Sequence, residues 1–134
     1  LERIRELARR CEKNGRPASQ DPALRRRIAQ ADARIEAMRL NGLRFLTKQL
    51  KGEKLGAETS INKLLRAQLE IELGELALEI EGSLSVLGKG DPACPEDGHW
   101  QQVSLGWPEV VIGGGTPNIQ RNIIAERILG LPKD

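Results

Sequence analysis

Aromatic residues are nearly absent from this sequence of 134 residues, which has one phenylalanine, two tryptophans and no tyrosine. Proteins that bind single-stranded nucleic acid stack its bases on aromatic rings, so the scarcity argues against that function. Cysteine is also rare, and Cys11 and Cys94 lie far apart without Cys-x-x-Cys or Cys/His spacing. We therefore expect an aliphatic core, reduced thiols, no disulfide framework and no metal site.

Long hydrophobic runs are missing as well, because no stretch approaches the roughly 18 apolar residues of a membrane helix. No segment has the pattern of a secretory leader. The sequence starts at Leu1 with helix-interior spacing and no capping residue before it. We expect residues 1–134 to be one domain of a longer chain, located in a bacterial cytoplasm, with the mitochondrial matrix as the alternative.

Charge is distributed unevenly along the chain. Residues 1–51 carry 14 Lys and Arg against 6 Asp and Glu, whereas residues 52–134 carry 7 against 13. The pattern predicts two elements that attract each other, or parts of a larger assembly. We interpret the cluster Arg25, Arg26 and Arg27 as a solvated helix face in preference to a phosphate-binding site.

Hydrophobic periodicity and capping residues predict four main helical segments. We place them at residues 1–10, 22–50, 60–81 and 117–129. Asp21 is expected to cap the second helix, Thr59 or Ser60 the third, and Thr116 the last. Residues 83–99 are expected to be irregular, followed by a short helical turn at 100–103 that Trp107-Pro108 ends.

The predicted helices differ in how many apolar faces they carry. The second has one stripe, and the third has two faces, so the third should be sandwiched between neighbours. We expect another subunit or domain to cover its second face. The stripe of the second helix consists of Leu24, Ile28, Ala31, Ile35, Met38, Gly42 and Phe45.

Three consecutive glycines, Gly113 to Gly115, precede Thr116 and Pro117 at the start of the last helix. Glycine permits close approach of the backbone to a ligand, and the free amides at a helix start favour phosphate or carbonyl oxygens. A simple turn that leads into a capped helix is the alternative interpretation. The run is neither a dinucleotide-binding fingerprint nor a Walker loop.

The run Ile112-GGGTPNIQRNIIAERILGLP-Lys133 closely resembles the C-terminal end of acyl-CoA dehydrogenases, which follows a GGT-x-x-IQR-x-x-IA-x-R pattern. More weakly, the second and third helices are similar to that family's C-terminal helical domain, including the ending Ala77-Leu78-Glu79-Ile80-Glu81-Gly82. The resemblance implies an all-α four-helix bundle with up-down topology. In the family, this domain follows an N-terminal helical domain and a middle β-domain.

The activity that the resemblance implies is the FAD-dependent oxidation of an acyl-CoA thioester to the 2,3-enoyl-CoA. A carboxylate removes the α-proton, the β-hydrogen passes to the flavin as hydride, and electron-transferring flavoprotein reoxidises the FAD. Such a domain also forms the core of a homotetramer or heterotetramer, a dimer of dimers. The residues here are not expected to be active by themselves.

Residue by residue, Gly115, Thr116 and Asn118 match family positions at the FAD. Glu79 and Gly82 match, more weakly, a stretch that reaches the FAD of a neighbouring subunit, although many relatives have glutamine where Glu79 stands. Arg10 and Cys11 stand near the family's Arg-x-x-Phe-Gly segment, but the aromatic residue is missing. These departures predict an altered mode of holding the ADP half of FAD.

The position of the catalytic base in one branch of the family is occupied here by Gly114, which has no proton-accepting group. Another branch places its base on the preceding helix, where Glu2 and Glu6 are candidates only by proximity. A non-catalytic subunit of a heteromeric enzyme is therefore one alternative function. A helical binding module unrelated to flavin is another.

Overall fold

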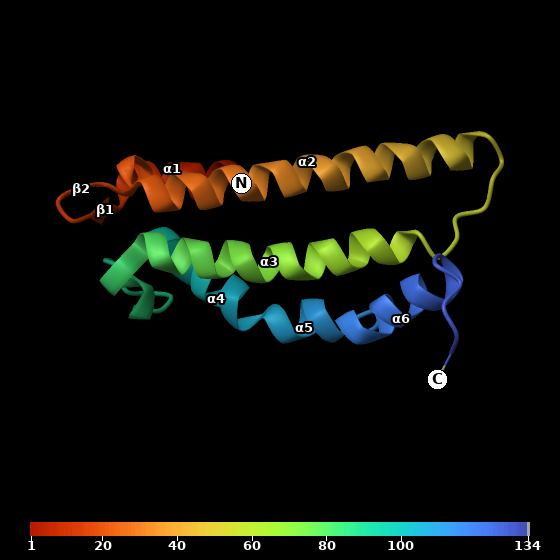
Figure 1. The fold of residues 1–134 in the computed structure, drawn as a ribbon. Helices are drawn as coiled ribbons and strands as arrows, with labels where there is room; N and C mark the ends of the chain where they lie inside the picture. The colour runs from red at the N-terminus through yellow and green to blue at the C-terminus, as the bar shows by residue number, and fades with distance from the viewer. Residues whose placement is uncertain (134) are drawn as a thin grey trace.

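The chain forms a three-layered arrangement of α-helices in the computed structural model, which describes residues 1–133 (Figure 1). The long helix α3 lies in the middle, with α1 and α2 on one side and three short helices on the other. Their bounds are α1 Glu2–Arg10, α2 Pro22–Leu50, α3 Thr59–Glu81, α4 His99–Leu105, α5 Trp107–Ile112 and α6 Pro117–Arg127. The predicted all-α class is confirmed. Three short helices, α4, α5 and α6, take the place of a single fourth helix.

Helix α2 begins where the sequence predicts. The carboxylate of Asp21 accepts hydrogen bonds from the amides of Ala23 (2.9 Å) and Leu24 (3.0 Å), and Pro22 occupies the first helical position. Both features satisfy helix-start requirements, because the first amides lack partners within the helix. The inward stripe follows the prediction except at Gly42, which is exposed, while Asn41 faces Asn62 of α3 instead.

The predicted cap of α3 is wrong. Neither Thr59 nor Ser60 caps the helix, because Thr59 is already its first residue and donates its hydroxyl backwards to the carbonyl of Gly56 (3.1 Å). Ser60 is buried. The first amides of α3 are satisfied by the turn before it, because Thr59, Ser60 and Ile61 donate to the carbonyls of residues 56–58. The carboxylate of Glu58 in this turn accepts from Lys48 Nζ at the end of α2 (2.6 Å). A backbone turn thus replaces the side-chain cap.

A small hairpin connects α1 to α2. Strands β1 (Glu12–Lys13) and β2 (Arg16–Pro17) pair antiparallel, and a single 3₁₀ turn, η1 (Ala18–Gln20), follows. Asn14 and Gly15 form the two-residue turn with φ of 55° and 72°. Asn-Gly suits this turn because both residues tolerate the left-handed region. The predictions from the sequence include no strand pairing at this position.

The segment after α3 is mostly irregular, as predicted, and contains the 3₁₀ turns η2 (Gly82–Val86) and η3 (Pro95–Gly98). The predicted helical turn at 100–103 is longer, because α4 spans His99–Leu105. Trp107-Pro108 does not break the chain; it begins α5, where proline in the first turn costs no hydrogen bond. The break falls at Gly106.

The core forms where α1, α2, α3 and α4 meet. Its buried members are Ile4, Leu7, Ala8, Ala18, Leu24, Leu76, Ala77, Ile80 and Trp100. Helix α3 contacts all the other α-helices, so its second apolar face is covered by α4, α5 and α6 of the same chain. The expectation that another subunit or domain must cover this face is therefore wrong, because these helices supply the cover.

Ion pairs join the basic helix α2 to the acidic helix α3, as the charge asymmetry predicts. Arg27 pairs with Glu79, and Arg34 pairs with Glu72. These exposed pairs contribute only modestly to stability, but they favour the observed alignment of the two helices. Within residues 1–133, no helix combines the length and apolar character that crossing a membrane requires.

Candidate functional site

The glycine run forms a tight turn between α5 and α6. Gly114 and Gly115 have φ of 72° and 99°, a region that side-chain-bearing residues rarely adopt. The amide of Gly113 donates to Glu109 O (2.8 Å), and the amide of Gly115 donates to Ile112 O (3.1 Å). The turn is thus closed by its own backbone. We call residues 113–116 the glycine loop.

The glycine loop leaves hydrogen-bond donors available at the start of α6. Within residues 1–133, the amides of Gly114 and Thr116 have no acceptor. Thr116 Oγ1 accepts from the amide of Ile119 (3.4 Å), as its predicted capping role requires, so its hydroxyl proton is free to be donated. The helix dipole adds positive potential here. The loop therefore suits a ligand that presents carbonyl oxygens or ring nitrogens.

Gly115, Thr116 and Asn118 lie together at this helix start. Asn118 is exposed, and its Oδ1 accepts from Arg121 (3.0 Å), which leaves its Nδ2 group free for a ligand. A Cβ on Gly115 would lie 2.8 Å from Nε2 of Gln120, so only glycine fits without a shift. The structure thus brings together the three residues matched to FAD contacts, and it lets the backbone approach a ligand closely.

Two side chains that the sequence interpretation missed hold the glycine loop and the helix before it. Gln120, which is 6% exposed, donates from Nε2 to Gly114 O (2.8 Å). Lys63 of α3 donates from Nζ to Val110 O (2.7 Å). Lys63 is distant in sequence, and a glutamine in the first turn of a helix is usually exposed. The family pattern quoted above includes Gln120 but indicates no role for it, and no local pattern identifies Lys63.

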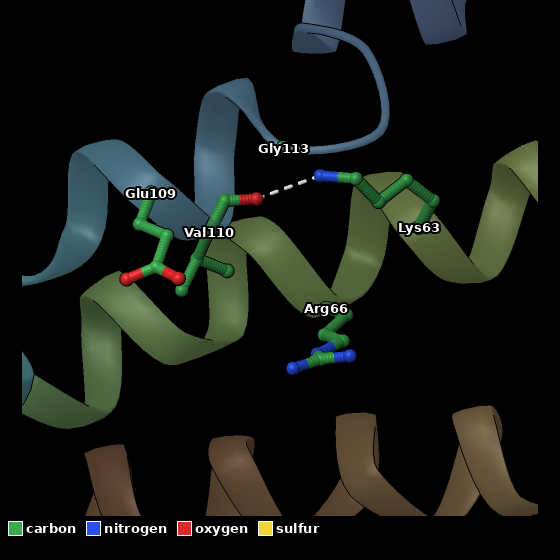
Figure 2. Close-up of a pocket in the computed structure, with 5 residues that line it drawn as sticks. All are labelled: Lys63, Arg66, Glu109, Val110 and Gly113. Atoms are coloured by element: carbon green, nitrogen blue, oxygen red, sulfur yellow. Dashed lines mark hydrogen bonds between the residues drawn. The ribbon is translucent and has the colours of Figure 1, made fainter.

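A cavity of about 400 Å³ lies beside the glycine loop, between α3 and α5 (Figure 2). Figure 2 shows Lys63 reaching the carbonyl of Val110, with Glu109 from α5 and Arg66 from α3 on the lining. The guanidinium of Arg66 is paired with Glu70 (2.6 Å), which raises the pKa of Arg66. Both cations are thus already engaged within the chain.

Gly114 stands where one branch of the family has its catalytic base, and it has no side chain that could accept a proton. It is exposed, and a Cβ placed there would lie 3.6 Å from Cε of Lys63. Glu2 and Glu6 are not brought near: both are exposed on α1, where they pair with Arg5 and Arg9. Figure 1 shows α1 and the α5–α6 connection on opposite sides of α3.

Glu79 and Gly82 lie at the far end of α3 from the glycine loop. Gly82 has φ of 59° and open space beside its Cα, which would permit a close backbone approach. Glu79, however, is engaged by Arg27 and by Lys13 (3.4 Å). A cavity of about 600 Å³ opens next to Gly82, and its lining includes Arg10 and Glu81.

The electrostatics of this second cavity do not suit a diphosphate. Glu81 is 3% exposed, and its Oε2 accepts from Gln101 (2.7 Å), while Oε1 has no partner within residues 1–133. Burial raises the pKa of Glu81, and the negative charge of Glu96 adds to the rise. The guanidinium of Arg10 is already paired with Glu96 (2.7 Å). An ADP group would meet carboxylates without a free cation.

Two comparisons by sequence identify the family. A family model described as the acyl-CoA dehydrogenase C-terminal domain matches residues 1–129, so the chain belongs to the acyl-CoA dehydrogenase family. Acyl-CoA dehydrogenase IpdE1 of Mycobacterium tuberculosis is 37% identical over 136 residues, covering 100% of this chain and 32% of that protein. IpdE1 of Mycolicibacterium smegmatis is 35% identical over 117 residues, covering 87% and 28%. The chain therefore spans about a third of the length of these relatives.

Solved structures share the fold. The ChsE4-ChsE5 complex from Mycobacterium tuberculosis has a TM-score of 0.84 at 24% identity, covering 99% of this chain and 34% of that one. The Tcur3481-Tcur3483 steroid ACAD has a TM-score of 0.83 at 26% identity, covering 99% and 33%. The FAD complex of PigA has a TM-score of 0.78 at 27% identity, covering 97% and 32%. These likenesses agree with the family assignment.

Proposed function

We propose that this chain is the flavin-contacting and oligomer-forming domain of an FAD-dependent acyl-CoA dehydrogenase, which oxidises an acyl-CoA thioester to the 2,3-enoyl-CoA. The observation that carries the proposal is the glycine loop, whose free amides and close-approach glycine stand at the start of α6. Family membership and the FAD complex of a relative with the same fold support it.

Gly115, Thr116 and Asn118 are the residues that would hold the flavin. Gly115 permits backbone approach, Thr116 offers its amide and hydroxyl protons, and Asn118 offers its Nδ2 group. These donors match the carbonyl and ring-nitrogen acceptors of an isoalloxazine ring. When bound, FAD supplies the hydride acceptor for the oxidation, and electron-transferring flavoprotein is the proposed acceptor of its electrons.

The α-proton must be removed by a carboxylate outside the glycine loop. Gly114 cannot accept a proton, and the cavity next to Gly82, at the end of α3 far from the glycine loop, does not fit an ADP group. These two observations favour a second candidate function: a non-catalytic subunit that shares the flavin site of a catalytic partner in a heterotetramer. The complex form of the ChsE4-ChsE5 relative supports a heteromeric assembly.

The acyl group is proposed to be a steroid-derived one, because a relative with the same fold is a steroid acyl-CoA dehydrogenase. Its fused rings would require a wide acyl pocket. This proposal is independent of the flavin proposal, since the same glycine loop would serve a straight-chain fatty acyl substrate.

The test is acyl-CoA-dependent reduction of an artificial electron acceptor by the full-length protein, alone and with candidate partner subunits. Activity of the protein alone supports a self-sufficient dehydrogenase, and activity only with a partner supports the shared-site candidate. No reduction under either condition, with steroid or fatty acyl-CoA, would contradict both. Comparison of kcat/KM for the two acyl classes decides the substrate proposal.

A further inference from the structure

Gln120 is one of three buried polar side chains among residues 1–133, the others being Ser60 and Glu81. Burying an amide is costly unless it is hydrogen-bonded. Gln120 meets this requirement by donating from Nε2 to the carbonyl of Gly114 at 2.8 Å. The side chain therefore faces the glycine loop, although it belongs to the helix that follows.

The amide of Gln120 fills the space against Gly115. A Cβ on Gly115 would lie 2.8 Å from Nε2 of Gln120 and 3.4 Å from Cγ2 of Ile119. The buried amide of Gln120 thus occupies space that a side chain on residue 115 would need. Glycine at this position leaves room for the amide that holds the preceding carbonyl.

Three consecutive glycines would sample many conformations without such a contact. The backbone bonds of Gly113 and Gly115 close the turn, and Lys63 holds α5 through Val110. The peptide plane between Gly114 and Gly115 has one side-chain partner among the described residues, which is Gln120. Together with the bond from the Gly115 amide to Ile112 O, which belongs to the same peptide plane, this contact fixes which way the Gly114 carbonyl points.

We propose that Gln120 is the positioning residue of the glycine loop: with the Gly115–Ile112 backbone bond it fixes the Gly114–Gly115 peptide plane, and this fixed plane sets the directions of the flanking amides of Gly114 and Thr116, which stay available to an acceptor on the flavin. The inference rests on the proposed flavin function. Gln120 itself is buried beneath the loop and is not proposed to contact the cofactor.

The experiment compares FAD affinity of the full-length protein, with its partner subunit where one is required, for Gln120→Leu and wild type. Leucine fills a similar volume without a donor, and we expect affinity to fall about tenfold, the effect of losing one well-placed hydrogen bond. Asn122→Leu is the matched control, because Asn122 is an exposed polar residue on the same helix. The control should bind FAD as wild type does.

Gln120→Glu separates a hydrogen-bonding role from a space-filling one. A protonated carboxyl can donate to the Gly114 carbonyl, whereas a carboxylate is repelled by it. Burial beside a carbonyl raises the pKa of such a carboxyl, so FAD affinity relative to wild type should be about tenfold weaker at pH 8 and should recover as the pH falls towards 5. Asn122→Asp controls for the added charge. A pH-independent loss would overturn the inference, as would no loss for either Gln120 variant.

Hydrogen exchange of the loop amides in flavin-free protein keeps the two proposals distinguishable. Faster exchange of the hydrogen-bonded amides of Gly113 and Gly115 in Gln120→Leu, with unchanged exchange in the core of α3, supports the positioning role even if wild type binds no FAD. Failure of the wild-type protein to bind FAD would contradict only the proposed function. Unchanged loop exchange in Gln120→Leu would overturn the positioning role.

Discussion

At the scale of single residues, burial decides what the carboxylates of this chain do. Glu75 and Glu81 lie on the same helix, but Glu75 is exposed and Glu81 is 3% exposed with one oxygen lacking a partner in the described chain. Removing a carboxylate from water penalises its charged form. The sequence presents both simply as members of an acidic helix, because burial depends on distant packing.

Glu81 predicts a specific pH dependence of stability. Its pKa is raised by burial above the ordinary value of 4.5, so the folded state binds a proton more tightly than the unfolded state. Protonated Glu81 therefore contributes favourably to the free energy of unfolding below pH 4.5, and this contribution is lost as pH rises through the raised pKa. Glu81→Gln should remove this loss and raise the melting temperature at pH 7 relative to wild type.

The measurement is thermal unfolding of wild type and Glu81→Gln between pH 4 and 8. Glu75→Gln is the matched control, and its melting curve should keep the pH dependence of wild type. Parallel pH profiles for wild type and Glu81→Gln would show that burial of this carboxylate does not destabilise the fold.

At the scale of elements, the central helix α3 depends on a close approach to α4. Gly74 is buried, and a Cβ there would lie 3.1 Å from Cα of Ser104 and 3.3 Å from its amide nitrogen. Such contacts are with backbone, so α4 would have to move. The glycine therefore permits the close contact by which α4 covers one part of the second face of α3.

Gly74→Ala should destabilise the protein although alanine is the better helix former. Gly42→Ala in α2 is the matched control, because a Cβ at Gly42 would meet no atom within 4 Å. The control should gain about 0.5–1 kcal/mol from helix propensity, whereas Gly74→Ala should lose about 1–3 kcal/mol from overpacking. Urea unfolding measures both. An equal gain for the two variants would contradict the close packing.

Much of this architecture is predictable from the sequence, because local chemistry determines it. Asp21-Pro22 fixes the start of α2, Gly82 the end of α3, and Thr116 the start of α6. The prediction of a side-chain cap for α3 is wrong, because the backbone carbonyls of the turn at residues 56–58 accept its first amides. Helix α5 was missed because proline tolerates the first helical turn.

The candidate site is likewise predictable only in part. The glycine loop is visible in the sequence, but the side chains that hold it are not. Gln120 stands in the quoted family pattern, but its role becomes visible only when its burial is known, and Lys63 lies 47 residues from its acceptor. Periodicity reports which face of a helix is apolar, and it carries no information about such long-range hydrogen bonds.

At the scale of the whole molecule, the outer face of α2 carries leucines that residues 1–133 leave exposed. They are Leu40 (49% exposed), Leu43 (46%), Leu46 (50%) and Leu50 (79%). An apolar stripe of this kind marks a contact surface. In the proposed oligomer, we expect a neighbouring subunit to cover it.

Replacing Leu43 and Leu46 together with glutamate should shift the full-length protein towards a smaller assembly, because charge disfavours burial of this face. Ala33 and Ala37 are exposed positions on the same helix, and the matched control replaces both with glutamate. Light scattering measures the mass. An unchanged mass for the leucine variant would place the interface elsewhere.

The central claim is that this chain contributes to a flavin site, and a visible absorption spectrum tests it most directly. The full-length protein is purified alone and then together with candidate partner subunits, and each sample is compared after equilibration with FAD. We predict a protein-bound flavin band in one of these states, weakened by Gln120→Leu. The absence of bound flavin in every state would contradict the account.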